Sequence, residues 1–166
     1  MKRTIILLTA LAALIISTPM FAATATSNLA VSASVAANCT ISTLPVAFGP
    51  YDPLGANSTT PAGDLAGSGS ITVTCTKGGG ATVDLGLGLY AVGSVRNMSD
   101  ATDTLTYELY TDSGHTTVWG SGATTNTIGG ATSKTPRVIP VYGLVPGAQY
   151  VGAGSYVDTV VATVNY

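Results

Sequence analysis

Few residues of this chain could do chemistry, and the two cysteines, Cys39 and Cys75, come first among them. In an exported chain such a pair is typical of one structural disulfide. The bond would close a loop of about 37 residues and stabilise the fold by about 3–4 kcal/mol on the chain-entropy model. A redox or metal role is the alternative, but the cysteines lack a Cys-x-x-Cys spacing and the only histidine, His115, lies far away in the sequence.

Catalytic arrangements find little support in the residues that remain. A Ser-His-Asp triad would have to use His115, which lies in a turn-like Asp-Ser-Gly-His-Thr stretch, and no Gly-x-Ser-x-Gly elbow is present. The Gly86-Leu87-Gly88 run lacks the third glycine and the helix of a phosphate loop. Asp100 and Asp103 lie in a loop that lacks the ligand count of an EF-hand calcium loop, and a solvated loop is the better interpretation. We therefore predict no catalytic, cofactor or metal site, and no enzyme.

The first residues are typical of a secretory signal peptide. Lys2 and Arg3 provide a positive start, residues 5–16 are apolar, and small residues follow. The apolar run is shorter than the roughly 20 residues that a membrane span needs. We predict a signal peptide over residues 1–25, with cleavage between 22 and 25.

The mature chain would be acidic and poor in charge. Without Lys2 and Arg3, 4 of the 6 basic residues remain against 8 acidic ones, so the net charge is 4 − 8 = −4. This balance argues against nucleic acid or an anionic membrane as a partner. Charged residues make up 8% of the chain, against roughly 25% in typical proteins. A surface of small and hydroxyl side chains repels its own copies weakly, although any hydroxyl-rich secreted β protein would share it.

Apolar residues alternate with polar ones along several short segments, as expected for strands with one buried face. We predict such strands in residues 71–75, 81–89, 105–110, 138–142 and 156–166. The glycines after Lys77 predict a hairpin or a corner between two sheets, and Pro140 predicts an edge or a bulge. Residues 49–69 are rich in glycine and proline and predict a surface excursion. The pattern as a whole predicts an immunoglobulin-like β-sandwich.

The two ends of the mature chain complement each other. The last segment places one set of side chains on a common inward face: Tyr156, Asp158, Val160, Ala162, Val164 and Tyr166. If this segment is the penultimate strand of the sandwich, the final strand is missing and an edge and a groove stay open. Residues 29–35 alternate in the same way, and no turn folds them onto a neighbour. This strand would join either its own sheet or that of another molecule.

Together these landmarks resemble the spore coat protein U domain, the domain of archaic (Csu-type) chaperone–usher pilins. The likeness spans residues 26–166. The segments that carry it are residues 38–41 (Asn-Cys-Thr-Ile), 48–53 (Phe-Gly-Pro-Tyr-Asp-Pro), 71–75 (Ile-Thr-Val-Thr-Cys), 105–110 (Leu-Thr-Tyr-Glu-Leu-Tyr), 139–143 (Ile-Pro-Val-Tyr-Gly) and 156–166.

The resemblance implies an incomplete immunoglobulin-like sandwich that lacks its final strand, over residues 38–166, preceded by a donor strand over residues 26–37. In such pilins a periplasmic chaperone lends a strand to each subunit, and at an outer-membrane usher the next subunit's N-terminal strand replaces it. Counted back from the first cysteine, the inward-facing donor residues are Leu29, Val31, Ala33 and Val35. Alanine at the third position is smaller than the family's typical donor residue.

The expected function is that of a structural subunit of a surface pilus, exported through the periplasm and serving adhesion and biofilm formation. Its partners would be like subunits joined by donor-strand exchange, the chaperone and the usher, with no cofactor, small-molecule substrate or nucleic acid. A self-assembling spore-coat or secreted surface protein of the same family is the alternative. A tip adhesin would need an extra receptor-binding domain, for which the chain has no room.

Overall fold

The computed structural model describes residues 21–78, 80–120, 126–128 and 134–166. The chain divides into two units, residues 1–34 and 35–166. Residues 21–34 of the first unit contain no regular secondary structure. Most of the predicted signal peptide, residues 1–20, lies outside the described residues. No described residue belongs to a helix that is long and apolar enough to cross a membrane.

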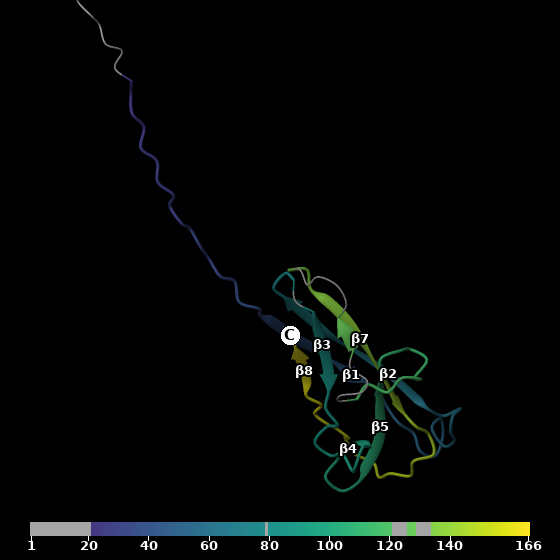
Figure 1. The fold of residues 1–166 in the computed structure, drawn as a ribbon. Helices are drawn as coiled ribbons and strands as arrows, with labels where there is room; N and C mark the ends of the chain where they lie inside the picture. The colour runs from purple at the N-terminus through teal and green to yellow at the C-terminus, as the bar shows by residue number, and fades with distance from the viewer. Residues whose placement is uncertain (1–20, 79, 121–125, 129–133) are drawn as a thin grey trace, which may run out of the picture. The chain divides into compact units, whose positions relative to one another are not determined.

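The second unit is an all-β, immunoglobulin-like domain in which antiparallel strands form two sheets (Figure 1). One sheet has the order β1-β2-β7-β5-β4 and the other the order β6-β3-β8. The strands among the described residues are β1 (Cys39–Ala47), β2 (Leu65–Cys75), β3 (Ala81–Leu85), β4 (Arg96–Ser99), β5 (Thr104–Tyr110), β6 (Asn126–Ile128), β7 (Arg137–Val145) and β8 (Ala162–Asn165).

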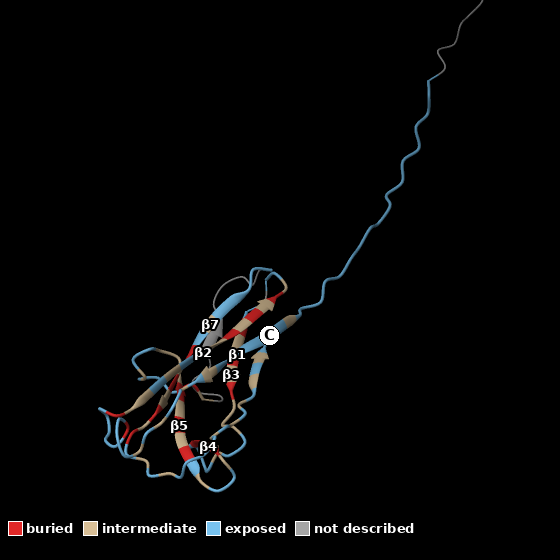
Figure 2. Cartoon of the chain, turned by 180° about the vertical axis from the view of Figure 1, so that it is seen from behind, coloured by how far each residue is buried: buried red, intermediate tan, exposed pale blue. Residues whose placement is uncertain are grey.

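The core lies between the two sheets and follows the alternation of the sequence (Figure 2). Every second residue is buried in β3, in β5 and in the second halves of β2 and β7, and those in between are partly covered. The fully buried Trp119 adds its indole to this core and donates a hydrogen bond to the carbonyl of Val83, 3.0 Å away. The alternating pattern therefore predicted the core strands correctly, because period-2 burial is what a two-layer β fold requires.

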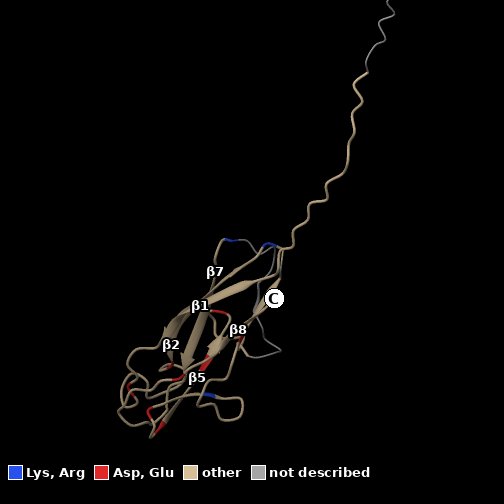
Figure 3. Cartoon of the chain, turned by 90° about the vertical axis from the view of Figure 1, so that its left-hand side faces the viewer, with Lys and Arg blue, Asp and Glu red and all other residues tan. Residues whose placement is uncertain are grey.

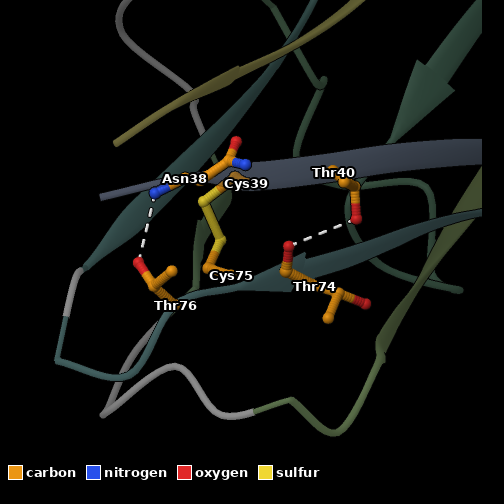
Figure 4. Close-up of a disulfide and its surroundings, with 6 residues drawn as sticks. All are labelled: Asn38, Cys39, Thr40, Thr74, Cys75 and Thr76. Carbon is orange, nitrogen blue, oxygen red and sulfur yellow. Dashed lines mark hydrogen bonds between the residues drawn. A yellow bond between two sulfur atoms is a disulfide. The ribbon is translucent and has the colours of Figure 1, made fainter. Parts of the chain in front are cut away.

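The predicted disulfide joins Cys39 to Cys75 where β1 begins and β2 ends (Figure 4). The Asn38 amide donates to the Thr76 hydroxyl at 3.1 Å and continues the pairing beyond the bond. The turn after Thr76 then carries the chain from β2 in one sheet to β3 in the other. Of the two predicted alternatives, the sheet-to-sheet corner is therefore the one that forms.

Two predicted segments have different boundaries in the structure. The excursion predicted for residues 49–69 ends at Asp64, because β2 already begins at Leu65. Positions 67 and 69 of this strand are glycine because β1 runs close over them. A Cβ at either position would lie 2.7–2.8 Å from backbone oxygens of β1. The strand predicted for residues 81–89 ends at Leu85, and Leu89 is exposed.

Pro140 lies where the sequence predicted an interruption. β7 is a central strand, but it pairs with β2 along its whole length and with β5 only over residues 142–144. Among the described strands, β7 thus has a partner on one side only at Pro140, which lies opposite Ser70. A residue without an N–H is tolerated at this point because no second described strand needs a donor there.

Candidate functional site

A groove of about 300 Å³ opens between the second half of β1 and the segment that leads into β8. We call it the groove. Its floor is made by core side chains of both sheets. The lining residues are Thr43, Leu44, Pro45, Val46 and Phe48 from β1 and its end, Leu85, Met98, Tyr107, Leu109 and Val141 from the floor, and Tyr156, Val157, Asp158, Val160 and Ala162 from the C-terminal segment.

The groove runs along two strand edges, that of β1 and, at the end of its C-terminal wall, that of β8. Among the described strands, β1 pairs only with β2 and β8 only with β3, so each turns one edge of backbone groups away from its partner. Apolar side chains of both walls are open to solvent rather than buried: Leu44 is 67% exposed and Val157 is 59% exposed. An open edge beside apolar side chains is a site where a further strand can pair.

The β1 wall is bent. The register with β2 shifts between Leu44 and Ala47, so that Pro45 lies in a bulge. Beyond it the half-buried Phe48 packs edge-on against Tyr107, with ring centroids 6.0 Å apart. No run of alternating apolar and polar residues spans β1, and this wall was not predicted.

The C-terminal wall shows the predicted alternation but little of the predicted strand. Five of the six residues predicted to face inward are partly buried, the exception being Tyr166, which is 59% exposed. The regular strand β8 covers only residues 162–165 of the predicted 156–166. The segment before it is held from two sides, because Val157 bridges to Ser99 while the Val161 carbonyl accepts the Gly86 amide at 2.9 Å. Switching between partners prevents one continuous ladder.

Asp158 fixes this wall to the floor. Its carboxylate accepts the Tyr107 hydroxyl at 2.6 Å and the Leu89 amide at 2.8 Å. Tyr107 is 4% exposed, and burial together with this hydrogen bond to Asp158 raises the pKa of Tyr107 above its ordinary value. The sequence placed Asp158 on the inward face, and its partner Tyr107 explains why an acidic residue is tolerated there.

The raised pKa of Tyr107 predicts a loss of stability at alkaline pH. The unfolded chain releases the phenolic proton near pH 10, whereas the folded chain retains it, so the free energy of unfolding falls as the pH rises above about 10. Tyr107→Phe is expected to make this fall shallower in urea unfolding between about pH 8 and about pH 11. Tyr150→Phe, at an exposed position, is the matched control. Equal slopes for the two variants and the parent chain would contradict the assignment.

The sequence did not reveal the polar cluster behind the groove. Arg96 is fully buried and forms an ion pair with Glu108. Its guanidinium also donates to the carbonyls of Gly86 at 2.8 Å and Trp119 at 2.7 Å. Arg96 thereby links β4 and β5 of one sheet to the end of β3 in the other, next to the amide that holds the C-terminal wall. The only signal was an arginine in a stretch with little charge.

The predicted donor residues lie in a stretch without secondary structure. Leu29 is 88% exposed, Val31 and Val35 are each 87% exposed, and Ala33 is exposed as well. An apolar side chain at every second position is thus fully open to solvent. Exposed apolar stripes of this kind are typical of surfaces that bind a partner.

The other chemically interesting residues lie in separate loops. His115 adopts a positive φ of 53° in the turn after β5 and packs edge-on against Tyr110. Asp100 accepts backbone amides of its own loop, and these bonds hold its pKa below the usual range. Within the described ranges no three metal-ligating side chains come together.

The Spore Coat Protein U domain model matches residues 25–163, most of the chain. The chain belongs to this family. Protein U of Myxococcus xanthus is 40% identical to this chain over 179 aligned positions, which cover 99% of this chain and 98% of the relative.

One solved structure supports the immunoglobulin-like fold of this spore coat protein U domain. It is the CsuC–CsuE chaperone–tip adhesion subunit pre-assembly complex from the archaic chaperone–usher Csu pili of Acinetobacter baumannii. A chain of this complex superimposes with a TM-score of 0.57 at 23% identity. The match covers 80% of the present chain and 40% of that chain. At this identity the likeness concerns the fold.

Proposed function

We propose that this protein is a structural subunit of an archaic chaperone–usher surface pilus, and that residues 26–37 of one copy fill the groove of the next. The observation that carries the proposal is the match between two parts of one chain. The domain has an apolar groove between two open strand edges, and the segment before it has an exposed apolar side chain at every second position. Strand addition to an open edge joins such surfaces.

The physical chemistry of the joint favours a long-lived contact. Full burial of Leu29, Val31 or Val35 contributes about 1.5–3 kcal/mol per side chain, and Ala33 contributes less. Each new backbone hydrogen bond to the edges of β1 and β8 adds about 0.5–1.5 kcal/mol. The joint needs no covalent link, and Ala33 marks its shallowest point.

Partners and location follow from the same proposal. Before assembly the groove would be filled by a strand of a periplasmic chaperone, and exchange would take place at an outer-membrane usher. The family and the likeness to a chaperone–subunit complex support this order of events. The signal peptide over residues 1–25 would export the chain to the cell surface, where the pilus would serve adhesion and biofilm formation. Nothing in this role requires catalysis.

Deletion of residues 26–37 from the mature chain tests the proposal. The shortened chain keeps its groove but has no strand to donate, so we expect it to bind the chaperone and to form no polymer. A chain with residues 26–37 scrambled, so that the apolar side chains no longer alternate, is the matched control and should fail in the same way. Polymers from either variant, seen by electron microscopy or as detergent-resistant ladders on gels, would overturn the proposal.

A second candidate function is a surface coat that assembles without an usher. It is favoured by the 40% identity to Protein U over nearly the whole of both chains. The two functions differ in their requirement for accessory proteins. The pilus proposal expects chaperone and usher genes beside this one and no surface polymer on cells that lack either gene, whereas the coat proposal expects surface assembly in such cells as well.

A further inference from the structure

The basic side chains on the surface of the domain gather at one end. Lys77 follows the end of β2, and Arg137 opens β7 opposite Val73 of β2. Lys134 precedes Arg137 by three residues, and all three side chains are exposed. We call these three residues the basic pole. Figure 3 shows blue segments at this upper end of β7. The remaining basic residue of the domain, Arg96, is buried and paired with Glu108.

Half of the acidic residues lie at the opposite end, which we call the acidic pole. Asp52 and Asp64 belong to the loop between β1 and β2, and Asp100 and Asp103 to the loop between β4 and β5. The eleven residues of β2 separate this pole from the basic one, a length of about 35 Å. In Figure 3 the red segments are concentrated at this lower end.

The acidic pole contains a depression, which we call the hollow. It has a volume of about 870 Å³ and lies between residues 46–54 on one side and residues 150–156 on the other, with Asp52 in its lining. Asp103 accepts the amide of Gly152, a lining residue, at 2.9 Å. Carboxylates therefore border both sides of a depression that is large enough to receive protruding side chains.

The linker between the donor strand and the domain, residues 36–38, is short enough to bring the two poles of neighbouring copies together. Three residues separate Val35 from Cys39, so the domain of the donor begins at most about 14 Å from the point where Val35 is seated. The C-terminal wall runs from Tyr156, which also lines the hollow, up to Asn165, which pairs with Thr82 beside the basic pole. A donor strand antiparallel to this wall places its own domain at the acidic pole of the acceptor. A parallel strand would place basic pole against basic pole.

We propose that the hollow at the acidic pole receives the basic pole of the copy that donates its strand. This inference rests on the proposed function and adds a second contact to it. Opposite charges at the two poles select the antiparallel direction of the donor strand, since the parallel direction brings like charges together. Such contacts at the rim of an interface act mainly on the rate of association and its salt dependence.

Polymer growth of the mature full chain, followed by light scattering after dilution from denaturant, tests the inference. Lys77→Glu/Lys134→Glu reverses two of the three exposed charges of the basic pole. Asp100→Asn/Asp103→Asn removes charge from the acidic pole and keeps an oxygen acceptor for the loop amides. At about 20 mM salt we expect the lysine variant to grow about 10-fold more slowly than the parent chain, with the difference lost at about 0.5 M salt.

A double-mutant cycle separates contact between the poles from a general effect of net charge. If the poles meet, the lysine reversals should slow growth much less in the Asp100→Asn/Asp103→Asn background than in the parent. Equal slowing in both backgrounds, or growth rates that are equal in all four chains, would overturn the inference.

A synthetic peptide of residues 26–37 makes failure of the inference distinguishable from failure of the proposed function. The peptide fills the groove but carries no basic pole, so it should block polymer growth at the same concentration in every variant. A blocking peptide together with identical growth rates overturns the contact between poles alone. A peptide that blocks no variant overturns the proposed function and the inference with it.

Discussion

Val31→Asp in the mature full chain is expected to abolish polymer formation and leave the folded domain intact. The substitution places a carboxylate where the donor strand would enter an apolar groove, and burial of an unpaired charge costs several kcal/mol. Val31 is 87% exposed, so the variant should unfold at the same urea concentration as the parent. Electron microscopy and urea unfolding monitored by tryptophan fluorescence measure the two effects, Trp119 being the only tryptophan.

Ser32→Asp is the matched control for this variant. It adds the same charge one residue further along, on the face of the donor strand that points away from the groove, and we expect it to polymerise. If the two variants polymerise equally well, or if both fail, the period-2 account of the donor strand is wrong.

Arg96→Ala is expected to destabilise the domain by about 3–5 kcal/mol, because removing one partner of a buried ion pair leaves the other uncompensated. The variant loses the pair with Glu108 and leaves the carbonyls of Gly86 and Trp119 without their donor. The free energy of unfolding in urea measures this loss. Because Arg96 holds the end of β3 beside the C-terminal wall, we expect the groove of this variant to bind the donor strand less tightly as well.

Two further variants test whether the loss of stability comes from the buried contacts of Arg96. Arg96→Lys keeps the charge but not the forked donors, so its stability should lie between those of the alanine variant and the parent. Lys134→Ala at the exposed basic pole is the matched control and should change stability by less than about 0.5 kcal/mol. A loss below about 1 kcal/mol for Arg96→Ala would contradict the role of this residue as a link between the sheets.

The sequence predicted those parts of the fold that depend on a single strand. Ile71, Val73, Leu105 and Leu109 alternate with polar neighbours and are buried as expected, because period-2 burial is a local property. Features that depend on a second strand were less visible. The sequence predicts a loop at Gly67, because the need for a residue without a side chain arises from β1, which only the tertiary structure brings above it.

The candidate site was predictable from one side only. The alternation that leads into β8 revealed the C-terminal wall, although pairing with two different strands leaves only a short regular ladder. The β1 wall was hidden because the bulge at Pro45 interrupts its pattern. The buried contacts of Arg96 could not be predicted, because its partners, two carbonyls and Glu108, come from three separate parts of the chain.

Disulfide trapping between two copies tests the central claim most directly. One copy of the mature chain carries one added cysteine in residues 29–35 besides the native disulfide, and a second copy of different size carries Val160→Cys in the wall of the groove. The proposal predicts mixed dimers on non-reducing gels for substitutions at Leu29, Val31, Ala33 or Val35, strongest at the position opposite residue 160, and none for Ala30, Ser32 or Ser34. Equal yields at odd and even positions, or no mixed dimer at any odd position, would contradict the account.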